Sequence, residues 1–463
     1  MQINKKIYHD YLIVTSIVMA VFASVMSSSM LVLCYPEIME SFHLTLKEFH
    51  WRTFFFFCSF SIGLLFFGVM AKKIGARRQF FFGMILFIIS TLGSVFAPNW
   101  KIFIFCQILQ ALSDAMMVST MPILIRNFIS SDRLGWAFGL EATILSSSGL
   151  IGPPLGRIIA GYWGWQSIFY FLACVTFLSF VLSLYILPSF KEEIKKDLPL
   201  PYLSIFAIFS LFFSVQCLIN IEDYKIGSFI GIILSIVVFV TQEFSTSTKI
   251  IPKNIIKNKP FLMCLLLIFC IATISNLLFF FTPAFLQGYL QISSTTLSWI
   301  IALDALVPIF FSTYFGKLSD RSPHKIFIVG VALYTLSLML FSYVYLDINL
   351  WMLTGIYMVL GFGSALMSPS QMKLTISIIP FSETGTYMGL YYFVQFSCGS
   401  FATIIFMAIT SSDSLSYIRL TPQDFKSILL FSTLTMLVVL YGGFLRNRFN
   451  FLALSKISHD KDL

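Results

Sequence analysis

Charged residues are scarce in this chain of 463 residues. Asp, Glu, Lys and Arg make up 11% of the sequence, whereas 58% of the residues are hydrophobic and 53 are Phe. A soluble domain carries roughly 25% charged residues, and a chain with far fewer cannot cover its surface with water-compatible groups. The composition therefore excludes an ordinary soluble protein and indicates a protein surrounded by lipid.

Motifs of catalytic or metal chemistry are also lacking. The eight cysteines lie within apolar runs and form no CxxC pair, and the five histidines fall in predicted loops or tails. This pattern is typical of small buried or lipid-facing cysteines, not of a disulfide framework or a metal site. The glycine-rich GLIGPPLG lies inside an apolar run and follows no predicted strand, which excludes a phosphate-binding loop. We therefore expect no enzyme, no catalytic residues, no cofactor and no metal.

Long apolar runs are what the sequence has in abundance. A helix needs about 20 apolar residues to cross the hydrocarbon core of a bilayer. Measured between charged or Pro/Gly-marked breaks, that length predicts an all-α integral membrane protein with about fourteen transmembrane helices. The predicted spans are 11–34, 53–71, 79–97, 102–125, 136–158, 166–187, 202–220, 227–243, 261–282, 296–317, 325–345, 350–369, 385–409 and 427–445.

The basic residues orient these spans, because Lys and Arg resist translocation. With a cytoplasmic N-terminus, 23 of the 30 Lys and Arg residues fall in cytoplasmic segments, six fall outside, and Arg157 lies within the membrane. One missed helix would invert every later loop and erase this bias. We therefore expect a multi-pass protein of the cell (inner) membrane with both termini cytoplasmic. The net charge of +9 is spread over short loops and indicates no nucleic-acid partner.

The spans divide into two six-helix bundles and an insert. Residues 1–187 form the first bundle, 188–260 a two-helix insert with cytoplasmic tethers, and 261–463 the second bundle with a tail. A repeat marks the loop after the second helix of each bundle. Its two copies are Gly68-Val-Met-Ala-Lys72-Lys-Ile-Gly75-Ala-Arg77 and Gly316-Lys-Leu-Ser-Asp320-Arg321. Internal repeats of this kind place a substrate cavity between the halves, near the bilayer midplane.

These loops resemble the G-x-L-x-D-R-x-G-R-[KR] signature of the major facilitator superfamily. The second copy is a good match, whereas the first has Lys72 where the family has Asp. The resemblance implies that the Asp caps or pairs across a cytoplasmic helix junction and helps to lock the outward-open state. Asp320, with Arg321, is the better candidate for this role.

The fifth span carries a second family motif. Gly149-Leu-Ile-Gly152-Pro153-Pro154-Leu-Gly156-Arg157 is similar to G-x-x-x-G-P-x-x-G-G, which in this superfamily is characteristic of antiporters. Glycines four apart let two helices approach closely, and Pro removes a helical hydrogen bond and permits a bend. The segment is either a flexing gate or a tight helix crossing with no moving part. Together with fourteen spans, it makes the chain resemble the fourteen-helix drug:proton antiporter branch, which includes multidrug and tetracycline exporters.

Ionisable residues at bilayer depth are candidates for function, because each costs roughly 2.5–3.5 kcal/mol to insert. Asp114 lies midway along the fourth span, Asp304 midway along the tenth, and Arg157 ends the glycine-proline motif. A carboxylate in a low dielectric can take up and release a proton near neutral pH. Alternating that proton with a cationic or polar substrate would couple export to the proton gradient. Otherwise each carboxylate is held by an interhelical hydrogen bond or by Arg157.

The fourth span departs from the resembled branch. The branch motif R-x-x-Q-G reads Gln107-Ile-Leu-Gln110-Ala here, so the proton-linked Arg is replaced by Gln. Asp114 lies four residues past Gln110 on much the same helix face. We expect it to have taken over proton coupling, with Arg157 as its positive partner. Glu141 lies a turn or two inside the fifth helix, where it can snorkel to the cytoplasm, and is a further candidate.

The function that we expect is proton-coupled export of drug-like or amphipathic small molecules through alternating access. The partners expected are a small-molecule substrate, protons and the lipid bilayer, and we expect a monomer. The alternative is a transporter of the same fold with a dedicated metabolite substrate, such as a siderophore or an amino-acid derivative, in either direction. The glycine-proline motif favours the first function, and the missing family charges favour the second.

Overall fold

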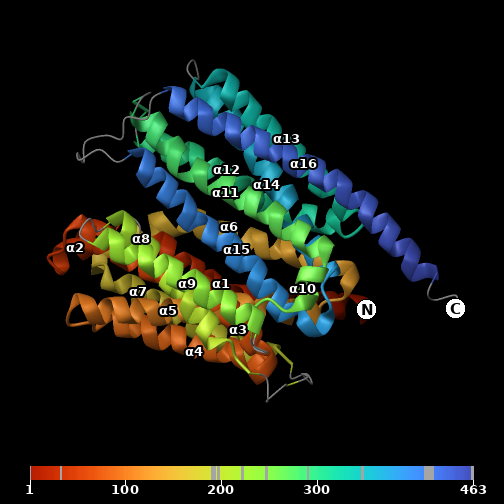
Figure 1. Cartoon of the computed structure of the whole chain (residues 1–463), viewed down its shortest axis with the longest axis horizontal. Helices are drawn as coiled ribbons and strands as arrows, with labels where there is room; N and C mark the ends of the chain where they lie inside the picture. Colours follow the sequence, from red (N-terminus) through yellow and green to blue (C-terminus); the bar gives the residue numbers. More distant parts are fainter. Residues whose placement is uncertain are drawn as a thin grey trace. The chain divides into compact units, whose positions relative to one another are not determined.

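The structure is a computed structural model that describes residues 2–31, 34–188, 194, 199–220, 224–245, 249–288, 291–292, 294–345, 349–410 and 422–459 (Figure 1). These residues contain helices and no strand. Fourteen of the described helices are 19 residues or longer. They are α1 (Gln2–Leu31), α3 (Leu46–Ile74), α4 (Ala76–Val95), α5 (Trp100–Phe128), α6 (Leu134–Trp163), α7 (Gln166–Ile186), α8 (Tyr202–Asn220), α9 (Lys225–Ser245), α11 (Lys259–Gly288), α12 (Ser294–Ser319), α13 (Pro323–Val344), α14 (Leu350–Ser377), α15 (Thr384–Thr410) and α16 (Pro422–His459).

The all-helical fold predicted from the sequence is confirmed, with each long helix overlapping one predicted span. In the described part of the chain, eleven helices are long and apolar enough to cross a membrane. The short helices α2 (Tyr35–Ser41) and α10 (Lys253–Lys257) were not predicted. Neither is long enough to cross a bilayer, which needs about 20 residues.

One compact unit comprises Met1–Phe128, Ile151–Lys257 and Pro380–Phe393. At its centre α5 packs against α1, α3 and α4, and α7 packs against α1 and α4. Large aromatic side chains fill the space between these helices; Phe80, Phe87, Phe103 and Phe169 are fully buried. Because α5 is covered by three neighbours, the polar residues on it are hidden from lipid.

The other unit comprises Ile129–Leu150, Asn258–Ile379 and Val394–Leu463. Here α14 packs against α12 and α13, and α16 packs against α11 and α13. The rings of Phe285 and Phe425 stack with their centroids 4.1 Å apart. α14 corresponds to α5 in the first unit, since each contains a Pro followed four residues later by a basic residue, Pro369 and Lys373 in α14.

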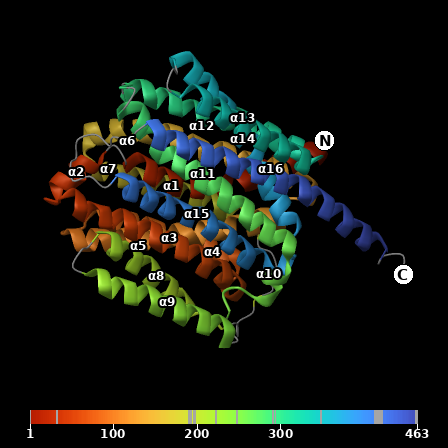
Figure 2. The same cartoon turned by 45° about the horizontal axis from the view of Figure 1, so that its top comes forward.

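The helices α8 and α9 form a pair beside the first unit's other helices (Figure 2). α8 packs against α3, where Phe213 contacts the Trp51 ring with centroids 6.0 Å apart, and α9 packs against α8. Only 11% of the most apolar stretch of α9 is buried. The unit boundaries fall within α6 and α15, so the division into 1–187, 188–260 and 261–463 stays a prediction.

Candidate functional site

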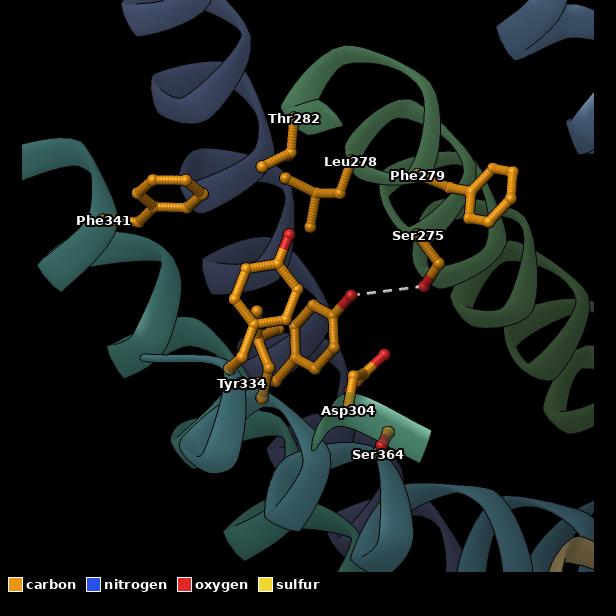
Figure 3. A pocket seen from close by; sticks show the side chains of 10 residues that line it. Ser275, Leu278, Phe279, Thr282, Asp304, Tyr334, Phe341 and Ser364 are labelled. Atoms are coloured by element: carbon orange, nitrogen blue, oxygen red, sulfur yellow. Dashed lines mark hydrogen bonds between the residues drawn. The ribbon is translucent and has the colours of Figure 1, made fainter. Parts of the chain in front are cut away.

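The second unit contains a cavity of about 140 Å³ with Asp304 in its wall. Polar groups converge on it from three further helices: Ser275 and Thr282 of α11, Tyr334 of α13, and Tyr357 and Ser364 of α14. Figure 3 shows the Asp304 carboxylate beside the Tyr334 ring. The hydroxyls of Tyr334 and Ser275 are hydrogen-bonded at 3.3 Å. Leu278, Phe279, Phe341 and Leu360 complete an otherwise apolar lining.

The sequence after Asp304 removes a backbone hydrogen bond from α12 beside the carboxylate. Pro308 lies inside this helix, four residues after Asp304. A proline has no backbone N–H, so the Asp304 carbonyl loses its usual helical donor. Gly361 of α14 lets this carbonyl come close, because a Cβ added there would lie 3.1 Å from it. Asp304 therefore sits at a weakened point of its helix.

Asp304 is a partly buried acid without a basic partner among the described residues. Its Oδ1 atom is buried and has no hydrogen-bond partner in the part of the chain that the structure describes. A buried polar group that is left unpaired costs about 1–3 kcal/mol. An unpaired buried group of this kind is typical of a functional site. A proton or a bound substrate would supply the missing partner.

The first unit hides a second acid, Asp114, on α5. Its side chain is 2% exposed, and the Ser24 hydroxyl of α1 is a hydrogen-bond partner. Its Oδ1 atom has no partner among the described residues. Asp114 thus resembles Asp304, because each is an acid with a buried, unsatisfied oxygen in the middle of a long apolar helix. The sequence analysis singled out both residues, and their roles stay predictions.

Gln107 and Gln110 lie two turns and one turn before Asp114, respectively, and belong to a buried polar chain. The Gln107 amide nitrogen donates to Gln110 Oε1 at 2.8 Å and to Ser94 Oγ at 3.1 Å. The Gln107 oxygen accepts from Arg52 of α3 twice, from Nε at 3.0 Å and from Nη2 at 2.6 Å. Position 107 lacks the arginine of the resembled motif, yet a guanidinium reaches it from the neighbouring helix.

Arg52 was missed by the sequence analysis, which counted it in an outer loop. The structure places it inside α3 with 5% of the residue exposed. It lies over the rings of Tyr35 and Phe56, 5.7 and 5.5 Å from their centroids, and its Nη1 donates to the Tyr35 hydroxyl at 3.3 Å. Its place four residues before Phe56 on one helix face was the available signal. Ser24, Tyr334 and Tyr357 carried no such signal, because only packing brings them to the acids.

Arg157 lies elsewhere than the sequence analysis expected. It forms an ion pair with Glu37 of α2, and the two side chains are 57% and 37% exposed. The positive partner expected for Asp114 is therefore engaged with another acid in an exposed position. Arg52, through the glutamines, is the cation that approaches Asp114 instead.

The glycine-proline segment is a continuous part of α6. Pro153 and Pro154 lie inside the helix without ending it. Gly152 and Gly156 pack against α1, since a Cβ at either would collide with Ser29 or Met30, whereas Gly149 has open space around it. Two of the three glycines thus serve a close helix crossing, and the proposed flexing of this segment stays a prediction.

Glu141 is buried in the first half of α6. The residue is 7% exposed, and its Oε2 atom has no partner among the described residues. The expected snorkelling to water is therefore not seen in this structure. Glu141 is a third acid with a buried, unsatisfied oxygen, and its role is a prediction.

The second copy of the loop motif forms a tight junction with the start of α6. The Asp320 carboxylate accepts hydrogen bonds from the backbone N–H groups of Gly135 at 2.7 Å and Trp136 at 3.0 Å. Lys373 donates to the same carboxylate at 2.6 Å and to the Asp320 carbonyl at 3.0 Å. Arg321, the next residue, is exposed. Asp320 thus caps the positive end of a helix while it pairs with a cation.

The first copy of the loop motif packs against α15. A Cβ added to Gly68 would lie 2.9 Å from Gly389 Cα, so the two helices touch backbone to backbone. Gly75 joins α3 to α4 with φ 93°, a conformation that glycine adopts without strain. Arg77 donates to the Leu187 carbonyl at 3.1 Å. Lys72 lies in the last turn of α3, at the position that corresponds to Asp320.

Comparison with known proteins identifies this architecture. The sequence matches the model of the Major Facilitator Superfamily over residues 17–403 and again over residues 263–450. The chain belongs to the Major Facilitator Superfamily. The second match starts in the later bundle, as an internal repeat would.

Two relatives match most of the chain. An uncharacterized MFS-type transporter of Bacillus subtilis, YwoD, is 24% identical over 406 residues, which cover 85% of this chain and 89% of the relative. The riboflavin transporter RibZ of Clostridioides difficile is 22% identical over 427 residues, which cover 90% and 91%. This member of the superfamily is therefore a transporter and a multi-pass membrane protein, not an enzyme.

Solved structures share the fold. The human organic anion transporter MFSD10 superimposes with a TM-score of 0.66 at 12% identity and covers 94% of this chain and 99% of its own. A bacterial homologue of the iron transporter ferroportin, in its outward-facing state, gives a TM-score of 0.64 at 13% identity with the same coverage. At these identities the likeness shows the superfamily fold alone.

Proposed function

We propose that this protein is a secondary active transporter that exports drug-like or amphipathic small molecules by proton antiport through alternating access. Among Major Facilitator Superfamily transporters, it belongs to the fourteen-helix drug:proton antiporter branch. The observation that carries the proposal is Asp304, a carboxylate with a buried, unsatisfied oxygen in the wall of a cavity. A site that holds either a proton or a substrate needs such a group.

The chemistry of the cavity supports an amphipathic substrate that bears a cation or a hydrogen-bond donor. The carboxylate supplies one negative charge, and the rings of Tyr334 and Tyr357 supply faces that attract cations. The Ser275 and Ser364 hydroxyls can fix the orientation of polar groups, while the apolar side chains accept the body of the molecule. When a proton occupies Asp304 the cationic group leaves, and when the substrate enters the proton is released.

A second candidate function is transport of a dedicated metabolite. Two observations favour it: the cavity is small, at about 140 Å³, and half of its ten lining residues carry polar side chains other than the acid. One relative that covers most of the chain is named a riboflavin transporter. A metabolite of fixed shape suits a small cavity with several hydroxyl groups better than a range of bulky drugs does.

The placement in the cell follows the same proposal. The protein lies in the cell (inner) membrane as a monomer with both termini cytoplasmic, as the distribution of Lys and Arg favours. The glycine-proline segment of α6 and the Asp320 junction change their packing as access alternates. Protons and a small molecule are the only ligands needed.

The test uses purified protein in liposomes that contain a pH-sensitive dye. A proton gradient is imposed, and cationic dyes, tetracyclines, quinolones and riboflavin are added in turn. Wild type is compared with Asp304→Asn and Asp114→Asn, and with Glu40→Gln as a matched control in the exposed part of α2. We expect substrate-driven proton flux in wild type and in the control, and its loss in Asp304→Asn.

A neutral asparagine resembles a protonated acid, the state that the cationic group leaves, so Asp304→Asn should lose binding and exchange of labelled substrate together with proton flux. Proton flux driven only by riboflavin would favour the metabolite function. Uphill transport by both asparagine variants at the wild-type rate would contradict proton coupling at these carboxylates.

A further inference from the structure

Arg52 is a buried cation whose partners are all neutral. Its guanidinium bonds to the amide oxygen of Gln107 and to the Tyr35 hydroxyl, and no acid pairs with it among the described residues. Because only 5% of the residue is exposed, water solvates little of the guanidinium charge. Burying an ion is unfavourable unless an opposite charge compensates it. The acid that compensates Arg52 must therefore act over a longer distance.

The polar chain that starts at Arg52 points toward such an acid. From Gln107 it continues to Gln110 Oε1 at 2.8 Å. The Nε2 atom of Gln110 is buried and has no partner, and the same is true of Asp114 Oδ1, among the residues described. Residues four apart are neighbours on a helix face. An unpaired donor and an unpaired acceptor thus lie one turn apart on one face of α5, and a single hydrogen bond between them would complete the chain.

We propose that Arg52 is a positioning residue for proton exchange at Asp114, and that it acts through the two glutamine amides between them. This inference rests on the proposed function, in which Asp114 exchanges a proton. When the carboxylic acid of Asp114 releases its proton to water, only the O–H bond breaks. The Gln110 amide then donates to the new carboxylate, and the chain from guanidinium to carboxylate closes. When Asp114 takes up a proton again, the chain opens to the arrangement in this structure.

The other charges around α5 lie toward the ends of its neighbours. Among the side chains that the structure describes, they are Asp10 on α1, Glu48, Lys72 and Lys73 on α3, and Arg77 and Arg78 on α4. α5 itself carries Lys101 and Arg126 near its ends, and between the ends the titratable groups besides Asp114 are the thiols of Cys58 on α3 and Cys106 on α5. Arg52 is the cation that the hydrogen bonds of the described residues connect toward Asp114.

The size of the effect follows from the distance. Gln107 and Asp114 are seven residues apart, which corresponds to roughly 10 Å along a helix. At this distance and an effective dielectric of about 20, removal of one positive charge shifts a proton equilibrium by about one pH unit. A cation favours the ionised carboxylate, so without Arg52 the acid holds its proton to a higher pH. The midpoint of the pH dependence of transport then rises.

The experiment measures transport in liposomes as a function of pH for folded, monodisperse variants. We expect Arg52→Gln to raise the midpoint by about one unit, Arg52→Lys to raise it less, and Gln110→Leu to raise it by interrupting the chain. The double variant Arg52→Gln/Gln107→Arg returns a guanidinium to the chain from α5 and should restore the wild-type midpoint. Lys101→Gln, an exposed cation at the start of α5, is the matched control and should leave the midpoint unchanged.

The outcomes separate this inference from the function on which it rests. If Asp114→Asn abolishes proton flux while Arg52→Gln and Gln110→Leu keep the wild-type midpoint, the positioning role of Arg52 is wrong and the proposed function stands. If Asp114→Asn transports as wild type does, the proposed role of Asp114 is wrong, and so is the positioning role of Arg52 that depends on it. A midpoint that moves in Arg52→Gln but is not restored by the double variant would contradict the route through position 107.

Discussion

Two helix junctions of this transporter share a backbone design and carry opposite charges. In one, the end of α12 crosses the start of α6, and a Cβ at Gly316 would collide with Gly135 and lie 2.9 Å from Gly139 Cα. In the other, the end of α3 crosses the start of α15 at Gly68, with Gly385 and Gly389 in the corresponding places. The crossing helices begin with the same pattern, Gly-x-x-x-Gly-Leu, at residues 135–140 and 385–390.

The charges at the two junctions are reversed. Asp320 follows Gly316 by four residues and caps α6, whereas Lys72 follows Gly68 by four residues. In the turn before each helix, Arg133 of one junction corresponds to Glu383 of the other. A carboxylate at a helix start is favourable and a cation there is not, because the helix dipole is positive at that end.

The basic residues near the two junctions, Lys373 and Arg126, also have different kinds of partner. Lys373 joins Asp320 in an ion pair whose side chains are 12% and 10% exposed. Its counterpart, Arg126, donates to the Thr384 hydroxyl at 2.7 Å and lies over the Phe381 ring. Small residues decide that helices can cross, and charge decides how firmly each crossing holds. We therefore expect the α6 junction to be the stronger of the two.

The largest expected effect comes from removing the acid of the stronger junction. Asp320→Ala leaves the Lys373 ammonium without its carboxylate and two backbone N–H groups without an acceptor, while the bond from Lys373 to the backbone carbonyl at 320 can remain. Breaking a buried ion pair costs about 3 kcal/mol or more. Thermal unfolding in detergent should show a clear loss of stability, and transport should fall with it.

Two further variants sharpen that measurement. Asp132→Ala removes an exposed acid from the turn just before α6 and should change little. Adding Lys373→Met to Asp320→Ala should recover part of the loss, because no buried charge is then left unpaired. Equal stability of Asp320→Ala and Asp132→Ala would refute the idea that this junction is held by charge.

A smaller effect is expected at the weaker junction. Arg126→Leu removes a hydrogen bond from a charged donor, worth about 1.5 kcal/mol, and the contact with the Phe381 ring. The same unfolding assay should show a loss about half of that for Asp320→Ala. A larger loss for Arg126→Leu than for Asp320→Ala would reverse the ranking of the two junctions.

Transplanting the charges tests the comparison by gain instead of loss. Lys72→Asp with Glu383→Arg gives the α15 junction the arrangement found at α6. We expect stability to rise by about 0.5 kcal/mol, the contribution of an acid near a helix start, and transport to slow because this crossing then holds more firmly. Lys72→Asp alone, which leaves the acidic Glu383 in the turn before α15, should gain less. Lower stability of the double variant would show that the contacts of Lys72 outweigh the gain from an acid near the helix start.

The smallest effect is expected at a helix start that is capped locally. Thr45 donates its backbone N–H at 2.8 Å and its hydroxyl at 2.7 Å to Glu48 at the exposed start of α3, and these bonds lower the pKa of Glu48. The cap thus contributes stability above the ordinary glutamate pKa and loses it as the pH falls through the lowered value. Thr45→Ala keeps the backbone bond, so carbon-13 NMR of Glu48 should show its pKa rise only part of the way. An unchanged pKa would mean that the hydroxyl contributes nothing.

The helices were predictable because each depends on its own stretch of sequence. The predicted span 202–220 coincides with α8, and 166–187 differs from α7 by one residue. The extra turns of α14, which runs to Ser377 instead of 369, were missed because Pro369 was taken as a break. A proline inside a packed helix is tolerated where neighbours compensate the lost bond, and the sequence alone does not tell the two cases apart.

The candidate site was predictable only as single residues. Asp114 and Asp304 were recognisable because a carboxylate in an apolar run is costly wherever it points. Their surroundings were not, since Ser24, Tyr334 and Tyr357 come from other helices. Arg157 was expected beside Asp114 and instead pairs with Glu37, and Arg52 was assigned to a loop and instead lies buried on Gln107.

The sequence by itself determined that the chain is a membrane protein of about fourteen helices, because about twenty residues decide by their own hydropathy whether a helix can span a bilayer. Only the tertiary structure decided the partners. The Asp320 carboxylate meets the Gly135 N–H across 185 residues of chain, and Arg52 meets Gln107 across 55. Such contacts depend on which helix faces pack together. Small residues such as Gly68 and Gly316 permit a close approach, but the local sequence does not indicate which helix will approach.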